Sequence, residues 1–184
     1  MKGNFPDISS ERLDLVKLGS FGLEDMHEYS VQEQFYNYLE FPPHQSIEET
    51  KIYLNKLLNR ASSDNVHYWF IKHKADKKII GSFGIRDIDW RKKIGDLSYG
   101  ISCDYTKRGY FTEVLDLVLR YLFEELEFHR VSAITRSDNL GSIKGLIKCG
   151  FSEEGVLRDF YLNPDDSRYD ATLLAILKVD YLRK

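Results

Sequence analysis

One strand–helix–strand segment, residues 94–136, constrains the fold more than any other part of the chain. Its first part predicts a strand over 94–103, and a long helix should open near Phe111. That helix carries a broad apolar stripe, made of Val114, Leu115, Val118, Leu119, Leu122, Phe123 and Leu126. Residues 130–136 predict the second strand. Because a crossover helix of this length connects parallel strands, these two strands should lie parallel in a sheet.

The rest of the chain predicts antiparallel strands and covering helices. Alternation of apolar and polar residues predicts strands over 11–18, 67–73, 79–90, 151–161 and 169–179. Helical spacing predicts helices over 21–32 and 47–61, and a shorter one that begins with Asp138 or Asn139 as its cap. The fold class expected is therefore mixed α/β (α+β). It has a largely antiparallel sheet of about seven strands and helices on both faces.

Length and charge narrow the classes of function. The 184 residues, 42% of them hydrophobic, fit a single domain over residues 1–184. A net charge of -3 argues against a general nucleic-acid binder. The sequence has no apolar run of about 18 residues and no signal-peptide pattern, so we expect a cytoplasmic protein that does not bind membranes. The histidine and cysteine spacing predicts no metal site.

The turn between the strand and the long helix has the features of an anion site. Lys107, Arg108 and Gly109 precede the helix, and the first N–H groups of a helix have no partner within it. This arrangement can hold a phosphate without a metal ion. The chain has neither a P-loop nor a Gly-x-Gly-x-x-Gly pattern after a strand, so a nucleoside triphosphate and a dinucleotide are both disfavoured.

Several short motifs, taken in their order along the chain, resemble those of the GNAT acetyltransferases. They are Arg108-Gly109-Tyr110-Phe111-Thr112-Glu113, Phe128-His129-Arg130-Val131, Asp138-Asn139, Ser142, Lys148-Cys149-Gly150-Phe151 and Glu154-Gly155-Val156-Leu157-Arg158. Within that superfamily the chain is most similar to the branch of ribosomal-protein N-terminal acetyltransferases, which act on alanine or serine. The match covers nearly the whole chain.

The resemblance implies acetyl-CoA as cofactor, with the sheet opening between its two parallel strands to admit it. The pyrophosphate would lie on the turn 106–112 and the pantetheine along the strand 100–103. The implied cofactor-binding residues are Ile101, Cys103, Lys107, Arg108, Gly109, Tyr110, Phe111, Thr112, Asn139 and Ser142. Thr106, Lys107 and Phe111 depart from the family pattern, and Phe111 stands where a small residue is usual.

Acetyl transfer to an amine requires a proton acceptor, a donor for the developing oxyanion and an acid for the thiolate. Asp96 is the candidate base, and a solvent-facing strand carboxylate is its alternative role. Ser142 is the candidate acid, with helix capping as its alternative. A main-chain N–H near Ile101 or Cys103 is the expected oxyanion donor. Direct attack on the thioester is preferred over an acyl-enzyme on Cys103.

The acceptor is an amine, either a peptide N-terminus or a small molecule. A protein N-terminal α-amine, with a pKa of about 7.7 to 8.0, needs only a weak base and is the leading acceptor. An amino acid, polyamine or antibiotic is the alternative, and a non-catalytic acyl-CoA-binding module is a third hypothesis. The resemblance suggests Tyr161, Tyr169 and Asp170 of the final hairpin as acceptor-binding residues, and it permits a homodimer.

Overall fold

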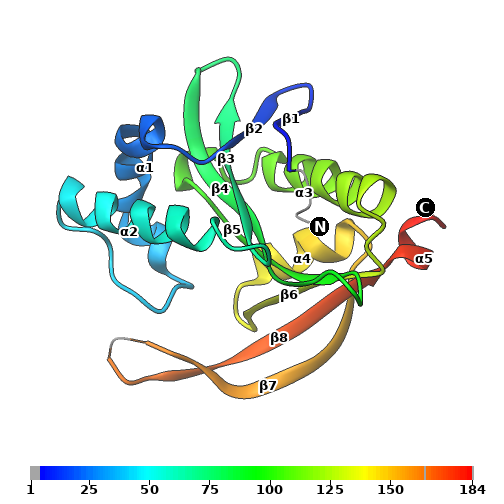
Figure 1. Ribbon diagram of the computed structural model, residues 1–184. Coiled ribbons are helices and arrows are strands. Elements are labelled where there is room, and N and C mark those ends of the chain that lie inside the picture. The colour runs from blue at the N-terminus through cyan, green and yellow to red at the C-terminus, as the bar shows by residue number, and fades with distance from the viewer. Residues whose placement is uncertain (1–4, 164, 184) are drawn as a thin grey trace.

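The computed structural model describes residues 5–163 and 165–183, which form one eight-stranded sheet covered by helices on both faces (Figure 1). The sheet order is β1-β2-β3-β4-β5-β6-β8-β7. Its strands are β1 (Ile8–Ser9), β2 (Leu13–Lys17), β3 (His67–His73), β4 (Lys78–Asp89), β5 (Ile94–Ile101), β6 (Arg130–Arg136), β7 (Ser152–Leu162) and β8 (Arg168–Leu177). The predicted mixed sheet is confirmed. The eighth strand is the two-residue β1, which is too short to produce an alternation pattern.

The helices divide between the two faces of the sheet. They are α1 (Leu23–Ser30), α2 (Ile47–Arg60), α3 (Tyr110–Arg120), α4 (Leu140–Lys148) and α5 (Lys178–Tyr181). Helix α3 continues as a π-helical turn over Tyr121–Glu125, and short 3-10 turns cover Ser20–Gly22, Glu33–Tyr36 and Cys103–Tyr105. Helices α1 and α2 cover one face, and α3 and α4 cover the other (Figure 1). No helix of the described residues is long and apolar enough to span a bilayer.

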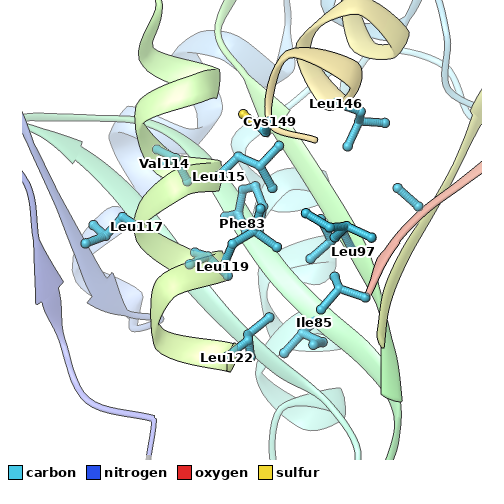
Figure 2. Close-up of a cluster of buried hydrophobic side chains, with 14 of the residues drawn as sticks. Phe83, Ile85, Leu97, Val114, Leu115, Leu117, Leu119, Leu122, Leu146 and Cys149 are labelled. Atoms are coloured by element: carbon cyan, nitrogen blue, oxygen red, sulfur yellow. The ribbon is translucent and has the colours of Figure 1, made fainter. Parts of the chain in front are cut away.

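The larger core lies between α3 and the central strands. Val114 and Leu115 of α3 are fully buried against Phe83 and Ile85 of β4 and Leu97 of β5 (Figure 2). Burial of one such side chain contributes roughly 1.5–3 kcal/mol relative to its exposed state. This burial fixes the position of α3, and the start of α3 is thereby held beside the end of β5.

The sheet opens between its two parallel strands. Strands β5 and β6 pair only through Ile94, Gly95 and Asp96, whose partners are residues 130–132. Beyond that point β5 continues along β4, and β6 continues along β8. The structure therefore contains the predicted opening, and Asp96 lies at its closed end.

Helix α4 begins and ends as its sequence indicates. The side chain of Asn139 accepts a hydrogen bond from the N–H of Ser142 at 3.1 Å, so Asn139 is the cap rather than Asp138. At the other end Gly150 has φ 88°, and its N–H donates to the Ile147 carbonyl at 2.9 Å. The N–H of Phe151 donates to the Leu146 carbonyl at 3.1 Å, completing a Schellman motif. Both ends of α4 are thus fixed by local hydrogen bonds.

One boundary differs from the prediction. It lies next to the turn of residues 106–109, which is called the anion turn below. Strand β5 ends at Ile101, whereas the sequence predicted a strand as far as Cys103. Cys103 instead opens the 3-10 turn Cys103–Tyr105, and the Ser102 N–H donates to the Ile80 carbonyl at 2.7 Å. The turn is closed by local main-chain bonds, from the Tyr105 N–H to the Ser102 carbonyl and from the Thr106 N–H to the Cys103 carbonyl, which the alternation of apolar residues does not reveal.

Buried His67 should make folding stability depend on pH. Its ring stacks on Phe5 at 4.2 Å, and its Nε2 has no hydrogen-bond partner among the described residues. Burial, aided by the charge of Lys17, lowers the pKa of His67 from 6.5 to about 4. Between these values the unfolded chain binds a proton that the folded protein does not. The free energy of unfolding should therefore fall by up to ~3 kcal/mol as the pH drops through this range.

Urea unfolding of His67→Phe between pH 4 and 7 checks this expectation. The variant should lose most of the His67 contribution to the acid slope, because phenylalanine keeps the ring stack and does not titrate. Exposed His129 provides the matched control as His129→Gln, which should keep the slope of the native protein. An unchanged slope in His67→Phe would contradict the assignment.

Candidate active site

The anion turn occupies the space between β5 and α3 and is open to solvent. Thr106 to Gly109 are exposed, and Gly109 has φ 81°, in the left-handed region that favours glycine. No side chain caps α3 at Gly109, and the N–H of Glu113 donates to the Gly109 carbonyl at 3.1 Å. The N–H groups of Tyr110, Phe111 and Thr112 precede that bond and lack intrahelical partners. With Lys107 and Arg108 beside them, these groups fit a phosphate.

Phe111, the largest departure from the family pattern, points away from this turn. Its ring packs between the two helices on this face, and a Cβ on Gly145 of α4 would lie only 2.6 Å from it. On its other side the Phe111 ring lies 4.6 Å from that of Tyr99. The glycine in α4 thus provides the space for the phenylalanine in α3, and the ring does not crowd the exposed turn.

Tyr99 connects β5, at the opening, with helix α4. Its hydroxyl lies 2.6 Å from the hydroxyl of Ser142, and either group can be the donor. Burial raises the pKa of Tyr99 well above its usual range, and the hydrogen bond with Ser142 offsets this only in part. Tyr99 therefore stays protonated at neutral pH and can supply a proton to Ser142. The Ser142 side chain does not cap α4, since the cap uses its main-chain N–H.

Asp96 lies where β5 and β6 separate. Its carboxylate accepts a hydrogen bond from Ser132, its partner residue on β6. Arg86 of β4 lies opposite Asp96 in the ladder, so the two side chains share the face turned away from α3. Asp96 is partly buried, which differs from the solvent-facing strand carboxylate considered as its alternative role.

Two main-chain N–H groups, those of Ile101 and Cys103, were considered as oxyanion donors. The N–H of Cys103 donates to the Gln32 side chain at 3.3 Å, so it is already engaged. Ser102 directs its N–H toward β4, and successive residues of a strand alternate in direction. By this alternation the N–H of Ile101 faces the opening. Burial, with the charge of Asp104, raises the pKa of the Cys103 thiol and disfavours the thiolate that an acyl-enzyme requires.

Of the three hairpin residues, Tyr161 lies beside the opening. Its hydroxyl donates to the Ile134 carbonyl of β6 at 3.1 Å, beyond the last residue that pairs with β5. Burial raises the pKa of Tyr161, and Glu40 adds to the rise while Arg86 and Arg136 oppose it. Tyr161 therefore shares a neighbourhood with Arg86, which lies opposite Asp96.

Tyr169 and Asp170 have contacts of their own elsewhere in the hairpin. The guanidinium of Arg136 lies 3.4 Å from the centre of the Tyr169 ring and also pairs with Asp138 at 2.6 Å. The Asp170 carboxylate accepts a hydrogen bond from the N–H of Asp159 at 3.0 Å. That bond stabilises the irregular stretch of β7, where Asp159 has φ 53°. Neither Tyr169 nor Asp170 contacts Asp96 directly.

Residues remote in sequence also reach the anion turn, and sequence reasoning missed them. Arg12 pairs with Glu113 at 2.6 Å and donates to the Arg108 carbonyl at 3.1 Å. Burial opposes ionisation of Glu113, but hydrogen bonds from Ser10 and Arg12 outweigh it and lower the pKa of this carboxyl. No local pattern links residue 12 to residue 113. Among the described residues, no group of acidic, histidine or cysteine side chains could hold a metal ion.

Comparison with known proteins identifies the family. The model of the acetyltransferase (GNAT) domain matches residues 12–152, most of the chain. The chain belongs to the GNAT acetyltransferases. It is an N-acetyltransferase that uses acetyl-CoA, and its GNAT fold is the one predicted from the sequence.

Three relatives illustrate which kinds of N-acetyltransferase the chain is similar to. YoaA of Bacillus subtilis, an uncharacterized N-acetyltransferase, is 25% identical over 95% of this chain and 98% of its own length. A spermidine N(1)-acetyltransferase of Vibrio cholerae is 24% identical over 95% and 98% of the two chains. YdaF of Bacillus subtilis, a putative ribosomal N-acetyltransferase, is 27% identical over 58% of this chain and 57% of its own.

A solved structure shows the same fold with its cofactor. The crystal structure of spermidine N-acetyltransferase from Vibrio cholerae in complex with CoA and spermine has a TM-score of 0.79. It is 22% identical and covers 94% of this chain and 99% of that one. These comparisons establish the cosubstrate of this GNAT enzyme, and they leave its acceptor to be argued from the site itself.

We expect Ser142→Ala and Tyr99→Phe to lower kcat by about 10²-fold or more without weakening CoA binding, because each removes one partner of the proton-donating pair. Steady-state kinetics with a CoA titration measures both effects. Ser63→Ala, on the surface, is the matched control. A purely structural role would instead lower the melting temperature while leaving kcat within about twofold.

Proposed function

We propose that this GNAT enzyme transfers the acetyl group to a protein N-terminal α-amine by direct attack on the thioester. The observation that carries the proposal is the opening of the sheet at Asp96. A carboxylate lies at its closed end, and the Tyr99–Ser142 pair lies on the other side of β5. The proposed base and the proposed acid thus lie on opposite faces of β5, one for the amine and one for acetyl-CoA.

Acetyl-CoA supplies the activated thioester, and the residues of this chain supply orientation and proton transfer. Asp96 accepts the proton of the amine, directly or through a water molecule. The N–H of Ile101 stabilises the developing oxyanion. Ser142, backed by the protonated phenol of Tyr99, provides the proton for the departing thiolate. The exposed turn 106–109 and the first N–H groups of α3, from Tyr110 to Thr112, bind the cofactor phosphates, and Asn139 holds the start of α4 in place.

The ease with which an amine loses its proton favours an α-amine as acceptor. Arg86 lies opposite Asp96, and Arg86 and Arg136 act on Tyr161, but each arginine has a carboxylate partner, Asp87 at 3.9 Å and Asp138 at 2.6 Å. These charges alone therefore do not select against a polyamine. An α-amine has only one charge to lose, and its low pKa suits a single weak base. Tyr161, Tyr169 and Asp170 remain the proposed acceptor-binding residues of the hairpin.

A small-molecule amine is the second candidate acceptor. It is favoured by the similarity to a spermidine N(1)-acetyltransferase over nearly the full length of both chains. Turnover of small amines and of peptides, measured side by side, distinguishes the two kinds of acceptor.

An acceptor screen tests the proposal. Release of free thiol from acetyl-CoA should be at least about tenfold faster, as kcat/KM, with peptides that begin with alanine or serine than with spermidine, because an α-amine has a low pKa and loses its proton to a weak base more easily. The same peptides with a blocked N-terminus are the control and should be inert. Faster turnover of spermidine would favour the second candidate, and CoA binding with no turnover would favour a binding module.

The variant Asp96→Asn tests the base. It keeps the size of the side chain and a hydrogen bond to Ser132 but cannot accept a proton, so kcat/KM should fall by about 10²-fold at pH 7. Activity should recover in part above pH 8, where the acceptor amine is already neutral. The measurement is the pH profile of kcat/KM, and an unchanged profile would exclude Asp96 as the base.

A further inference from the structure

Two tyrosines frame the exposed turn that carries the anion site. Tyr105 immediately precedes the exposed residues 106–109, and Tyr110 immediately follows them as the first residue of α3. Tyr110 is buried, and Tyr105 packs against the larger core. The middle of the turn is thus exposed to solvent, and the residues at its two ends pack against the protein.

Both tyrosines bind the same histidine–aspartate pair at the end of the β3–β4 hairpin. The Tyr110 hydroxyl lies 2.8 Å from Nε2 of His73. The Tyr105 hydroxyl donates to the Asp76 carboxylate at 2.6 Å. Asp76 and His73 are themselves joined by a 2.9 Å contact between Oδ2 and Nδ1. One pair of side chains therefore connects the two ends of the turn.

The His73 ring lies between the two tyrosines. Its Nε2 faces Tyr110, and its Nδ1 faces both the Asp76 carboxylate, at 2.9 Å, and the Asp76 main-chain N–H, at 3.4 Å. In the tautomer with the proton on Nδ1, the ring donates to the carboxylate and Nε2 accepts from Tyr110. The hydrogen bond from Tyr105 lowers the pKa of Asp76, and the same bond raises the pKa of Tyr105 to about 12. At neutral pH Asp76 is therefore ionised and Tyr105 protonated, so the bond between them can form.

A second contact holds the turn from the N-terminal side. The guanidinium of Arg12 lies over the Tyr110 ring at 4.5 Å, where it also donates to the Arg108 carbonyl. Lys107 has φ 61°, a left-handed conformation that is unfavourable for a residue with a side chain. A turn with this backbone keeps its shape only where its surroundings impose it.

We propose that His73 and Asp76 form a clamp that holds residues 106–109 in the shape that binds the cofactor phosphates. The clamp residues are positioning residues, because they act through Tyr105 and Tyr110. The inference rests on the proposed placement of the phosphates on this turn. A preformed turn lowers the ordering cost of binding, so the clamp sets the affinity for CoA rather than the rate of acetyl transfer.

The variants Tyr105→Phe and Asp76→Ala test the clamp in the full-length enzyme. The first removes the donor and the second the acceptor of the bond between these side chains, so the Kd for CoA, measured by calorimetry, should rise roughly three- to tenfold. The kcat at saturating acetyl-CoA and the KM for the acceptor should stay within about twofold. Hydrogen exchange of amides 106–112 in the enzyme without CoA should become faster. Asp76 lies in an exposed turn, so its substitution leaves the core intact.

Tyr181→Phe is the matched control. It removes the same kind of bond, from the Tyr181 hydroxyl to the Glu124 carboxylate at 2.7 Å, near the other end of the α3 segment. It should change neither the Kd for CoA nor exchange in the turn.

Gly109→Val separates the clamp from the site on which it acts. Valine at φ 81° distorts the turn directly, so the Kd for CoA should rise whether or not the clamp matters. An unchanged Kd in Tyr105→Phe and Asp76→Ala, with a raised Kd in Gly109→Val, would overturn the clamp and leave the cofactor site standing. An unchanged Kd in all three variants would overturn both.

Discussion

The partial pairing of β5 with β6 is the interaction on which the rest of the site depends. Three residues of each strand pair in parallel, and the strands then separate because each remains bonded to its other neighbour in the sheet. The separation exposes main-chain groups of β5 without unfolding it. It also places Asp96 and Ser132 at the closed end, where the two strands still touch. The opening thus arises from an interrupted ladder rather than from a loop.

The two helices on one face convert this opening into a site with two sides. Helix α3 is fixed by its apolar stripe on β4 and β5, and its first N–H groups consequently lie beside the end of β5 (Figure 2). Helix α4 is fixed by its cap and by the contact of Phe111 with Gly145, which brings Ser142 to Tyr99. The same core packing that stabilises the fold therefore sets the distance between the proposed acid and the anion turn.

Much of the fold could be predicted from the sequence, because local patterns encode it. The stripe of α3 and the glycine stop at Gly150 depend on neighbours a few residues away, and they were located correctly. The end of β5 was placed at Cys103 instead of Ile101, because the apolar pattern does not show where main-chain bonds close a 3-10 turn. The part of the proposed site with a family motif, from Arg108 to Thr112 and from Asn139 to Ser142, was proposed from the sequence and stays a prediction.

The sequence by itself determined the order of elements, the parallel pair and the position of the anion turn, since periodicity, caps and short motifs are properties of neighbouring residues. Only the tertiary structure decided which side chains meet there. Tyr99 with Ser142, Arg12 with Glu113, and His73 with Tyr110 are contacts between segments far apart in the chain. They form because the sheet and α3 bring those segments together, and no local pattern records such proximity.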